Sequence, residues 1–313
     1  MGDVSAVVSR DYPALFSLLA TQYARTPAHR KYLEARFSKA ESRDLAHLEQ
    51  LASHIAAIAG PKLPEVCDAY DFICKIVREE EIYFRRHGKY RLDNFEDANR
   101  LVYSNAEYMS KYMDGLLLTQ VYWSNHSASF RFYTDEFLGK APDGYDYLEI
   151  GPGHGLLLYE AKADRRCGSV TGWDLSLASI GRTTAALNAL GAKGKEPNLV
   201  LQDLFEIDER APKFDCVTFS EVLEHLERPE LALEKLLLIL KPKGRLFVNV
   251  PINSPAPDHL FLLRSTEEAV QFMKDAGFQI ERAEFFPMTN HTLDQARKHQ
   301  LTISACMIAR RPT

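Results

Sequence analysis

The spacing of apolar residues changes near residue 140, so the chain falls into two unlike parts. Before that point apolar residues recur at three- and four-residue steps, the period of an amphipathic helix. Helical stretches end at residues 60–61, open again at 64–65 and extend over 94–138, and the basic, aromatic residues 83–91 are expected to connect helices. The clearest run consists of Leu45, Leu48, Leu51, Ile55 and Ile58.

After a turn at residues 141–144, short apolar runs alternate with helical stretches. This alternation predicts an α/β fold with a doubly wound, mostly parallel sheet of seven strands. One of the last two strands could run antiparallel, because only residues 287–300 connect them. We therefore expect a helical N-terminal domain over 1–140 and an α/β core over 141–313. The expected strands are 147–150, 169–173, 199–201, 214–219, 245–250, 278–286 and 301–309.

A glycine-rich turn follows the first expected strand. Residues 147–156 read Tyr-Leu-Glu-Ile-Gly-Pro-Gly-His-Gly-Leu, so Gly151, Gly153 and Gly155 allow a tight turn and a close approach of the main chain to a ligand. A dinucleotide fingerprint needs a glycine where this chain has Leu156, which disfavours a nicotinamide oxidoreductase. Glu149 would repel a pyrophosphate and favour a cationic ligand.

Further polar residues stand where the next strands end. Asp174 comes 23 residues after Gly151, where doubly wound folds place an acid on ribose hydroxyls. Asp203 follows the third strand and could reach an adenine edge. The fourth strand delivers Ser220 and Glu221 to the same edge, where open α/β sheets bind ligands.

Together these segments make residues 145–310 resemble a class I S-adenosylmethionine-dependent methyltransferase. The resemblance implies S-adenosylmethionine over the glycine loop, Asp174 on its ribose, Asp203 near its adenine and Glu149 near its methionyl part. The implied cofactor site also includes Leu175, Leu204 and Ser220. A plain strand–helix turn is the alternative for the glycines alone.

Residues 220–229 carry the densest chemistry of the chain. If they begin a helix, Glu221, Glu224 and His225 share one face. The segment resembles that of ubiquinone-pathway O-methyltransferases and small-RNA 2′-O-methyltransferases, in which two Glu and a His, with a further His downstream, hold a divalent metal. The resemblance implies Glu221, Glu224, His225 and His259 as ligands of Mg²⁺, Mn²⁺, Fe²⁺ or Zn²⁺. Alternatively, these residues cap a helix or face solvent.

A metal there would lower the pKa of an acceptor hydroxyl. His225 is the best candidate for a general base or metal ligand, with Glu221 and Glu224 beside it. His126, His259 and His291 compete, and His291 lies in the last connection, which is expected to face the methyl end of the cofactor.

The helical part is expected to supply a lid over the substrate, and a homodimer could form through it. Its aromatic side chains could instead pack the helices onto the sheet. The lid candidates cluster just before the core: Tyr108, Tyr112, Tyr122, Trp123 and His126.

Composition narrows the choice of function. The 313 residues are 46% hydrophobic and 26% charged, so the chain can bury a core, and no apolar run is long enough to cross a membrane. A net charge of −5 argues against bulk attraction to nucleic acid. Five scattered cysteines without a CxxC pair fit a reducing cytoplasm.

The leading hypothesis is methyl transfer to oxygen, nitrogen or carbon of a small molecule. Metal-assisted 2′-O-methylation of RNA is the first alternative. An inactive cofactor-binding protein that acts as a structural or regulatory partner is the second.

Overall fold

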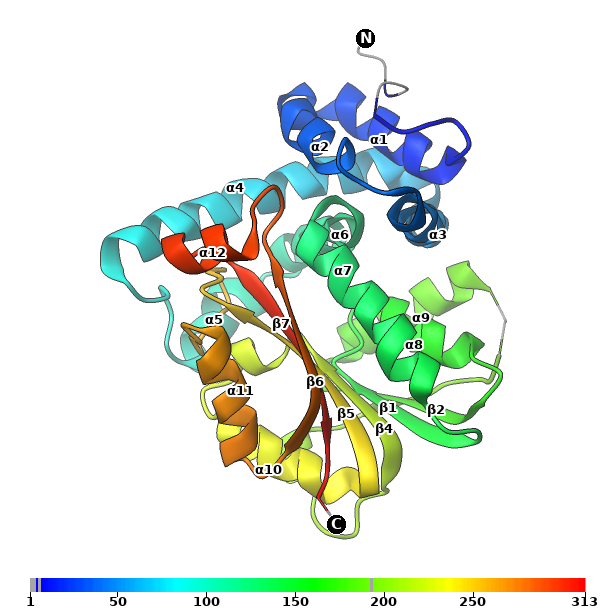
Figure 1. Cartoon of the computed structure of the whole chain (residues 1–313), viewed down its shortest axis with the longest axis vertical. Helices are drawn as coiled ribbons and strands as arrows, with labels where there is room; N and C mark the ends of the chain where they lie inside the picture. Colours follow the sequence, from blue (N-terminus) through cyan, green and yellow to red (C-terminus); the bar gives the residue numbers. More distant parts are fainter. Residues whose placement is uncertain (1–3, 5–6, 192–193, 313) are drawn as a thin grey trace.

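The described residues form one seven-stranded sheet in the order β3-β2-β1-β4-β5-β7-β6 in this computed structural model (Figure 1). The structure describes residue 4 and residues 7–191 and 194–312, so a few residues of the expected helical domain lie outside it. All seven expected strands are present, and each end lies within five residues of its expected position. They are β1 Tyr145–Ile150, β2 Cys167–Asp174, β3 Asn198–Leu201, β4 Phe214–Ser220, β5 Leu240–Ile252, β6 Gln279–Pro287 and β7 Ile303–Arg310.

Strand direction and register place the site. β1 runs parallel to β2 on one side and to β4 on the other, and Ile150 stands opposite both Trp173 and Phe219. The carboxyl ends of these three strands therefore meet at one edge, at the point where the strand order reverses. β7 is antiparallel to both β5 and β6, which confirms that one of the last strands reverses direction.

Helices cover both faces of the sheet (Figure 1). Along β1, Tyr147 packs with the helical region and α8, whereas Leu148 packs with α10 and α11 on the other face. Each face thus has its own apolar cluster, as the alternation of side chains along a strand requires. The helices are α1 Pro13–Arg25, α2 Arg30–Phe37, α3 Ser42–Ala59, α4 Leu63–His87, α5 Phe95–Ala98, α6 Ala106–Tyr122, α7 Ser124–Phe132, α8 Leu156–Ala163, α9 Leu177–Leu190, α10 Pro229–Ile239, α11 Thr266–Asp275 and α12 Leu293–His299.

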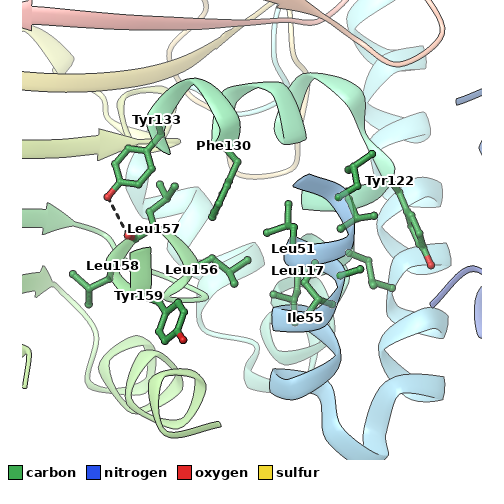
Figure 2. Packing of buried hydrophobic residues seen from close by; sticks show 14 of the residues in the cluster. Leu51, Ile55, Leu117, Tyr122, Phe130, Tyr133, Leu156, Leu157, Leu158 and Tyr159 are labelled. Atoms are coloured by element: carbon green, nitrogen blue, oxygen red, sulfur yellow. Dashed lines mark hydrogen bonds between the residues drawn. The ribbon is translucent and has the colours of Figure 1, made fainter. Parts of the chain in front are cut away.

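The helical region packs directly on the core. Figure 2 shows Leu51 and Ile55 of α3 beside Leu117 of α6, and the α7 segment that carries Phe130 crossing above α8. After α7, the Tyr133 hydroxyl donates a 3.0 Å hydrogen bond to the carbonyl of Leu157. A single apolar cluster therefore joins the helices that precede residue 141 to the sheet.

The expected connector at residues 83–91 is mostly helical, so that prediction was wrong. α4 continues to His87 because the buried Phe84 extends its apolar face, and it ends at Gly88 with φ of 67°. Arg85 donates to the carbonyls of His299 and Gln300, so the basic C-terminal end of α4 is bound to the chain at the end of α12. Among the described helices, none is both long and apolar enough to span a bilayer.

Candidate functional site

The loop after β1 follows a main-chain path that few side chains tolerate. Gly151, Gly153 and Gly155 have φ angles of 68°, 51° and 74°, the left-handed region that glycine adopts without steric cost. A Cβ atom added to Gly153 would lie 3.6 Å from the terminal methyl of Met113 in α6. The loop therefore makes the predicted tight turn, and α8 begins directly after it at Leu156.

Glu149 lies in β1, two residues before the loop, and its side chain is directed into the molecule. The residue is only 3% exposed, and its Oε2 accepts one long hydrogen bond of 3.4 Å from the Tyr147 hydroxyl. Burial raises the pKa of Glu149 well above its usual range. An ionised carboxylate here needs a cation beside it, so the environment fits a positively charged ligand at this end of the loop.

Asp174 ends β2 at the same edge of the sheet. Its carboxylate accepts hydrogen bonds from the backbone amide of Ser176 at 2.9 Å and from the hydroxyl of Ser179 at 2.5 Å. Burial raises its pKa above the usual value. The next residue, Leu175, is 61% exposed, an unusual place for a large apolar side chain beside an acid. An acid and an exposed apolar surface side by side suit a ligand that has both hydroxyl groups and a flat apolar ring.

The third and fourth strands end as predicted, but with different local roles. Asp203 caps the short helix that follows β3, and its Oδ1 accepts from the amide of Phe205 at 2.8 Å. Leu204 is buried next to it. Ser220 is the last residue of β4 and stands opposite Asn249 in β5.

The residues after β4 form a turn, so the expectation that a helix begins there was wrong. Glu221 has φ of 55°, outside the helical region, and only Leu223–His225 form a short 3₁₀ turn before α10 begins at Pro229. The Glu221 amide donates to the Asn249 carbonyl at 2.8 Å, and the Asn249 amide donates to Glu221 Oε1 at 2.7 Å. These two bonds to β5 hold the residue in its left-handed conformation.

Three of the four predicted metal ligands converge despite this change. One ligand atom each from Glu224, His225 and His259 lies within 4.8 Å of the other two. Glu224 is fully buried, and neither of its carboxylate oxygens has a hydrogen-bond partner among the described residues. His259 donates its Nδ1–H to the Ser254 carbonyl at 2.6 Å, which leaves Nε2 free to bind a metal. The donor set of carboxylate and imidazole therefore fits a divalent cation.

The electrostatics of this cluster follow from its burial. Burial and the neighbouring carboxylate of Glu221 raise the pKa of Glu224 well above its usual range. Burial also raises the pKa of Glu221 to about 7, although Glu221 lies outside the three-residue group. Burial and the nearby His225 ring lower the pKa of His259 to about 4, so its imidazole is neutral. A bound cation would favour the ionised form of both carboxylates and so lower the pKa of each.

The predicted lid residues divide into two groups. The Tyr112 hydroxyl donates to Asp258 Oδ1 at 3.2 Å, and Tyr108 stacks on the Tyr112 ring with centroids 6.0 Å apart. Tyr122 instead donates to the carbonyl of Leu18 within the helices, and Trp123 donates to the Tyr70 hydroxyl. These bonds pack Tyr122 and Trp123 within the helical region, so they give no support to a lid role, which for these two side chains stays a prediction.

The remaining histidines are scattered. His126 stands in the first turn of α7, with Nδ1 3.0 Å from the Thr119 hydroxyl of α6, and burial lowers its pKa to about 4. His291 is exposed and donates Nδ1–H to the carbonyl of Thr289 at 3.0 Å. The structure does not bring His291 into the cluster around Glu224.

Sequence reasoning missed Asp258, Tyr103 and Asn249. Asn249 lies near the carboxyl end of β5 and Asp258 lies in the segment after it, so the edge rule for strand ends could have indicated them. Tyr103 comes from the helical region and carries no local signal.

Comparison with known proteins places this geometry in context. A family model described as a methyltransferase domain matches residues 122–299, more than half of the chain. The ubiquinone biosynthesis O-methyltransferase of Alkalilimnicola ehrlichii is 32% identical over 133 residues, which is 42% of this chain and 51% of that protein. The enzyme of the same name from Marinobacter nauticus is 32% identical over 143 residues, 45% of this chain and 57% of that protein. The chain thus spans about half the length of these curated relatives.

Among solved structures, the N-methyltransferase NodS of Bradyrhizobium japonicum in complex with S-adenosyl-L-homocysteine aligns with a TM-score of 0.44 and 17% identity. The alignment covers 60% of this chain and 86% of that one.

Proposed function

Since the chain belongs to the class I S-adenosylmethionine-dependent methyltransferases, we propose that it transfers a methyl group from S-adenosylmethionine to a small-molecule acceptor with the help of a divalent metal. The observation that carries the metal-assisted part is Glu224, a fully buried carboxylate whose two oxygens lack a hydrogen-bond partner among the described residues. An acceptor oxygen agrees best with this proposal, because the curated relatives are named as O-methyltransferases.

The residues at the carboxyl ends of β1 to β4, around the glycine loop, fit the cofactor. When bound, S-adenosylmethionine would supply a methyl group on a positively charged sulfur that can leave as a neutral thioether. Glu149 would face the cationic methionyl end and gain a positively charged partner in addition to its one long hydrogen bond from Tyr147. Asp174 would accept from the ribose hydroxyls, and Leu175 would cover the adenine with Asp203, Leu204 and Ser220 nearby. The glycines let the main chain approach without a clash.

The residues after β4 and β5 fit a metal. Glu224, His225 and His259 would hold the cation, and Glu221 would add a further carboxylate beside them. The metal, Mg²⁺, Mn²⁺, Fe²⁺ or Zn²⁺, supplies positive charge that lowers the pKa of an acceptor hydroxyl. In this arrangement His225 would serve as a metal ligand rather than as the base, and Glu221, which lies outside the three-residue group, would take the proton of that hydroxyl.

The helical region supplies the rest of the acceptor site. Tyr108 and Tyr112 reach toward the cluster from α6 and give it an apolar wall with polar tips. The net charge of −5 disfavours RNA as the acceptor, and the main basic helix end, at α4, is engaged with the chain around α12. The five cysteines are free, in keeping with a cytoplasmic protein. A homodimer through the helices is compatible with this proposal.

Methyl transfer from isotope-labelled S-adenosylmethionine tests the proposal. A panel of catechols and phenols serves as small acceptors, and a short RNA serves as the alternative acceptor, each with added Mn²⁺ or with a chelator. We expect labelled ether products from small acceptors, lost with the chelator and in Glu224→Gln. Product that persists with the chelator would remove the metal from the proposal. Label in the RNA would favour the alternative, and no label in any acceptor would favour an inactive cofactor-binding protein.

A further inference from the structure

We propose that Asp258 is a positioning residue for His225, held in place by Tyr103 and Tyr112 from the helical region. This inference rests on the proposed metal-assisted function, because it concerns how one of the metal-binding side chains is oriented. It names a role for three residues that the family resemblance does not supply.

Asp258 lies in the segment after β5 and is almost completely buried at 2% exposure. Both of its carboxylate oxygens are engaged, since the Tyr112 hydroxyl donates to Oδ1 and the Tyr103 hydroxyl donates to Oδ2, each at 3.2 Å. A buried carboxylate with a donor on each oxygen has a fixed orientation. Neither tyrosine belongs to the sheet or to the helices that follow it.

His225 is fixed by the same residue. Its Nδ1 lies 3.1 Å from the main-chain carbonyl of Asp258 and 3.4 Å from Oδ2 of the side chain. The Tyr103 oxygen is 3.2 Å from the same nitrogen. With Nδ1–H donated to this group of oxygens, the other ring nitrogen is the one that lies near Glu224, with Nε2 3.8 Å from Oε1. A hydrogen bond from the ring nitrogen that does not bind the metal, here Nδ1, selects the tautomer and ring angle of a metal-binding histidine.

Further contacts restrict how the rings can move. The imidazoles of His225 and His259 meet edge to face, with centroids 5.0 Å apart and planes at 82°. The main-chain carbonyl of Glu224 accepts from the amides of Leu260 and Phe261, just beyond Asp258. The turn after β4 and the segment after β5 are therefore one unit, and Asp258 is one of the points where the helical region contacts it, beside the contacts of Tyr90 with Ser254 and His259.

The two tyrosines come from a part of the chain that the family model does not match. Tyr103 ends the π-helix Asn99–Tyr103, Tyr112 lies in α6, and the matched residues begin only at 122. A one-turn π-helix shifts the facing of the residues after it and often marks a functional position. The helical region would thus do more than cover the acceptor, since it would complete the support of the metal cluster.

Mn²⁺ binding, followed by the electron paramagnetic resonance of the free ion, tests this proposal on the full chain. The variants are Asp258→Asn and Tyr103→Phe, with Tyr112→Phe in case Asp258→Asn does not fold. Tyr145→Phe is the matched control. The Tyr145 hydroxyl also donates to an aspartate, the half-buried Asp164, at 3.1 Å, but Tyr145 begins β1 and so lies at the end of the strand away from the site. S-adenosylhomocysteine affinity is measured in parallel to confirm an intact core.

We expect the three variants to bind Mn²⁺ about 10- to 100-fold more weakly than the wild type, with S-adenosylhomocysteine affinity and the Tyr145→Phe control unchanged. Lower melting temperatures with unchanged Mn²⁺ affinity would overturn the proposal, because the tyrosines would then only hold the helices on the core. If Glu224→Gln loses Mn²⁺ while Asp258→Asn keeps it, the proposed function stands and this inference fails. A wild type that binds no Mn²⁺ would overturn both.

Discussion

Oε1 of Glu224 lies 3.8 Å from Nε2 of His225, yet within the described chain neither carboxylate oxygen of Glu224 accepts a hydrogen bond. A fully buried carboxylate without a partner is costly for a folded protein. Burial and Glu221 raise its pKa, which lessens this cost by favouring the protonated form. A bound divalent cation would remove the cost in another way and would explain why two acids and two histidines gather here.

Glu224→Gln separates stability from metal binding. The neutral amide removes the unpaired acid, so we expect the metal-free variant to be as stable as the wild type or up to about 2 kcal/mol more stable. Mn²⁺ should raise the melting temperature of the wild type but not that of the variant, because only the wild type retains the site. Thermal unfolding with Mn²⁺ and with a chelator checks both expectations. The exposed Glu209→Gln should behave as wild type, and an equal Mn²⁺ shift in Glu224→Gln would contradict the ligand assignment.

Glu149→Gln should weaken the binding of the positively charged cofactor more than that of its neutral-sulfur product. The variant removes the buried negative charge beside the glycine loop, and a sulfonium loses more by this than a thioether. We expect S-adenosylmethionine to bind about 10-fold or more weakly and S-adenosylhomocysteine to change less. Calorimetric titration of both ligands provides the measurement. Equal losses for the two ligands would place Glu149 away from the sulfur.

Gly115→Ala should destabilise the contact between α4 and α6. A Cβ atom at this position would lie 2.4 Å from the carbonyl oxygen of Ala69, and a main-chain atom cannot move aside as a side chain can. We expect a loss of about 2–4 kcal/mol in the free energy of unfolding, measured with urea. Gly181→Ala in α9 is the matched control, because a Cβ there meets nothing within 4 Å. That control should be neutral or up to about 1 kcal/mol more stable.

Glu160 should make stability depend on pH. Burial raises the pKa of this α8 side chain from 4.5 to about 7. The folded protein then holds the proton more tightly than the unfolded chain does. The contribution of Glu160 to the free energy of unfolding is therefore fully present below pH 4.5, and it is lost as the pH rises through 7. The loss amounts to at most about 3 kcal/mol.

Glu160→Gln should remove this part of the pH dependence and stabilise the protein above pH 7. Urea unfolding at pH 5 and at pH 8 checks the expectation, with Glu209→Gln as the exposed control. A wild type and a Glu160→Gln variant with parallel stability profiles between these two values would show that Glu160 does not titrate in this window.

The cofactor edge of the site could be predicted from the sequence because its geometry is local to strand ends. Gly151, Asp174 and Ser220 each follow an apolar strand, and parallel strands in register bring their carboxyl ends together. The strand assignments succeeded for the same reason, since buried parallel strands are short, nearly continuous apolar runs. The structure was needed for the order of the strands and to show that β7, of the last two strands, is the one that reverses.

Other parts of the site depend on contacts between distant residues. The left-handed conformation of Glu221 depends on Asn249 in another strand, so a helical spacing rule misjudged the turn between them. Tyr112 and Tyr122 stand on the same helix, yet one reaches Asp258 and the other reaches Leu18. The bond between Tyr103 and Asp258 joins residues 155 positions apart, and no local pattern encodes it.

Calorimetric titration with S-adenosylhomocysteine, alongside NAD as the rival ligand, tests the central claim most directly, because it does not require the acceptor to be known. We predict that the wild type binds one S-adenosylhomocysteine per chain, that Asp174→Asn binds it about 10-fold or more weakly with an unchanged melting temperature, and that NAD gives no binding heat. Absence of S-adenosylhomocysteine binding, or binding of NAD in its place, would contradict the assignment of this edge of the sheet to S-adenosylmethionine.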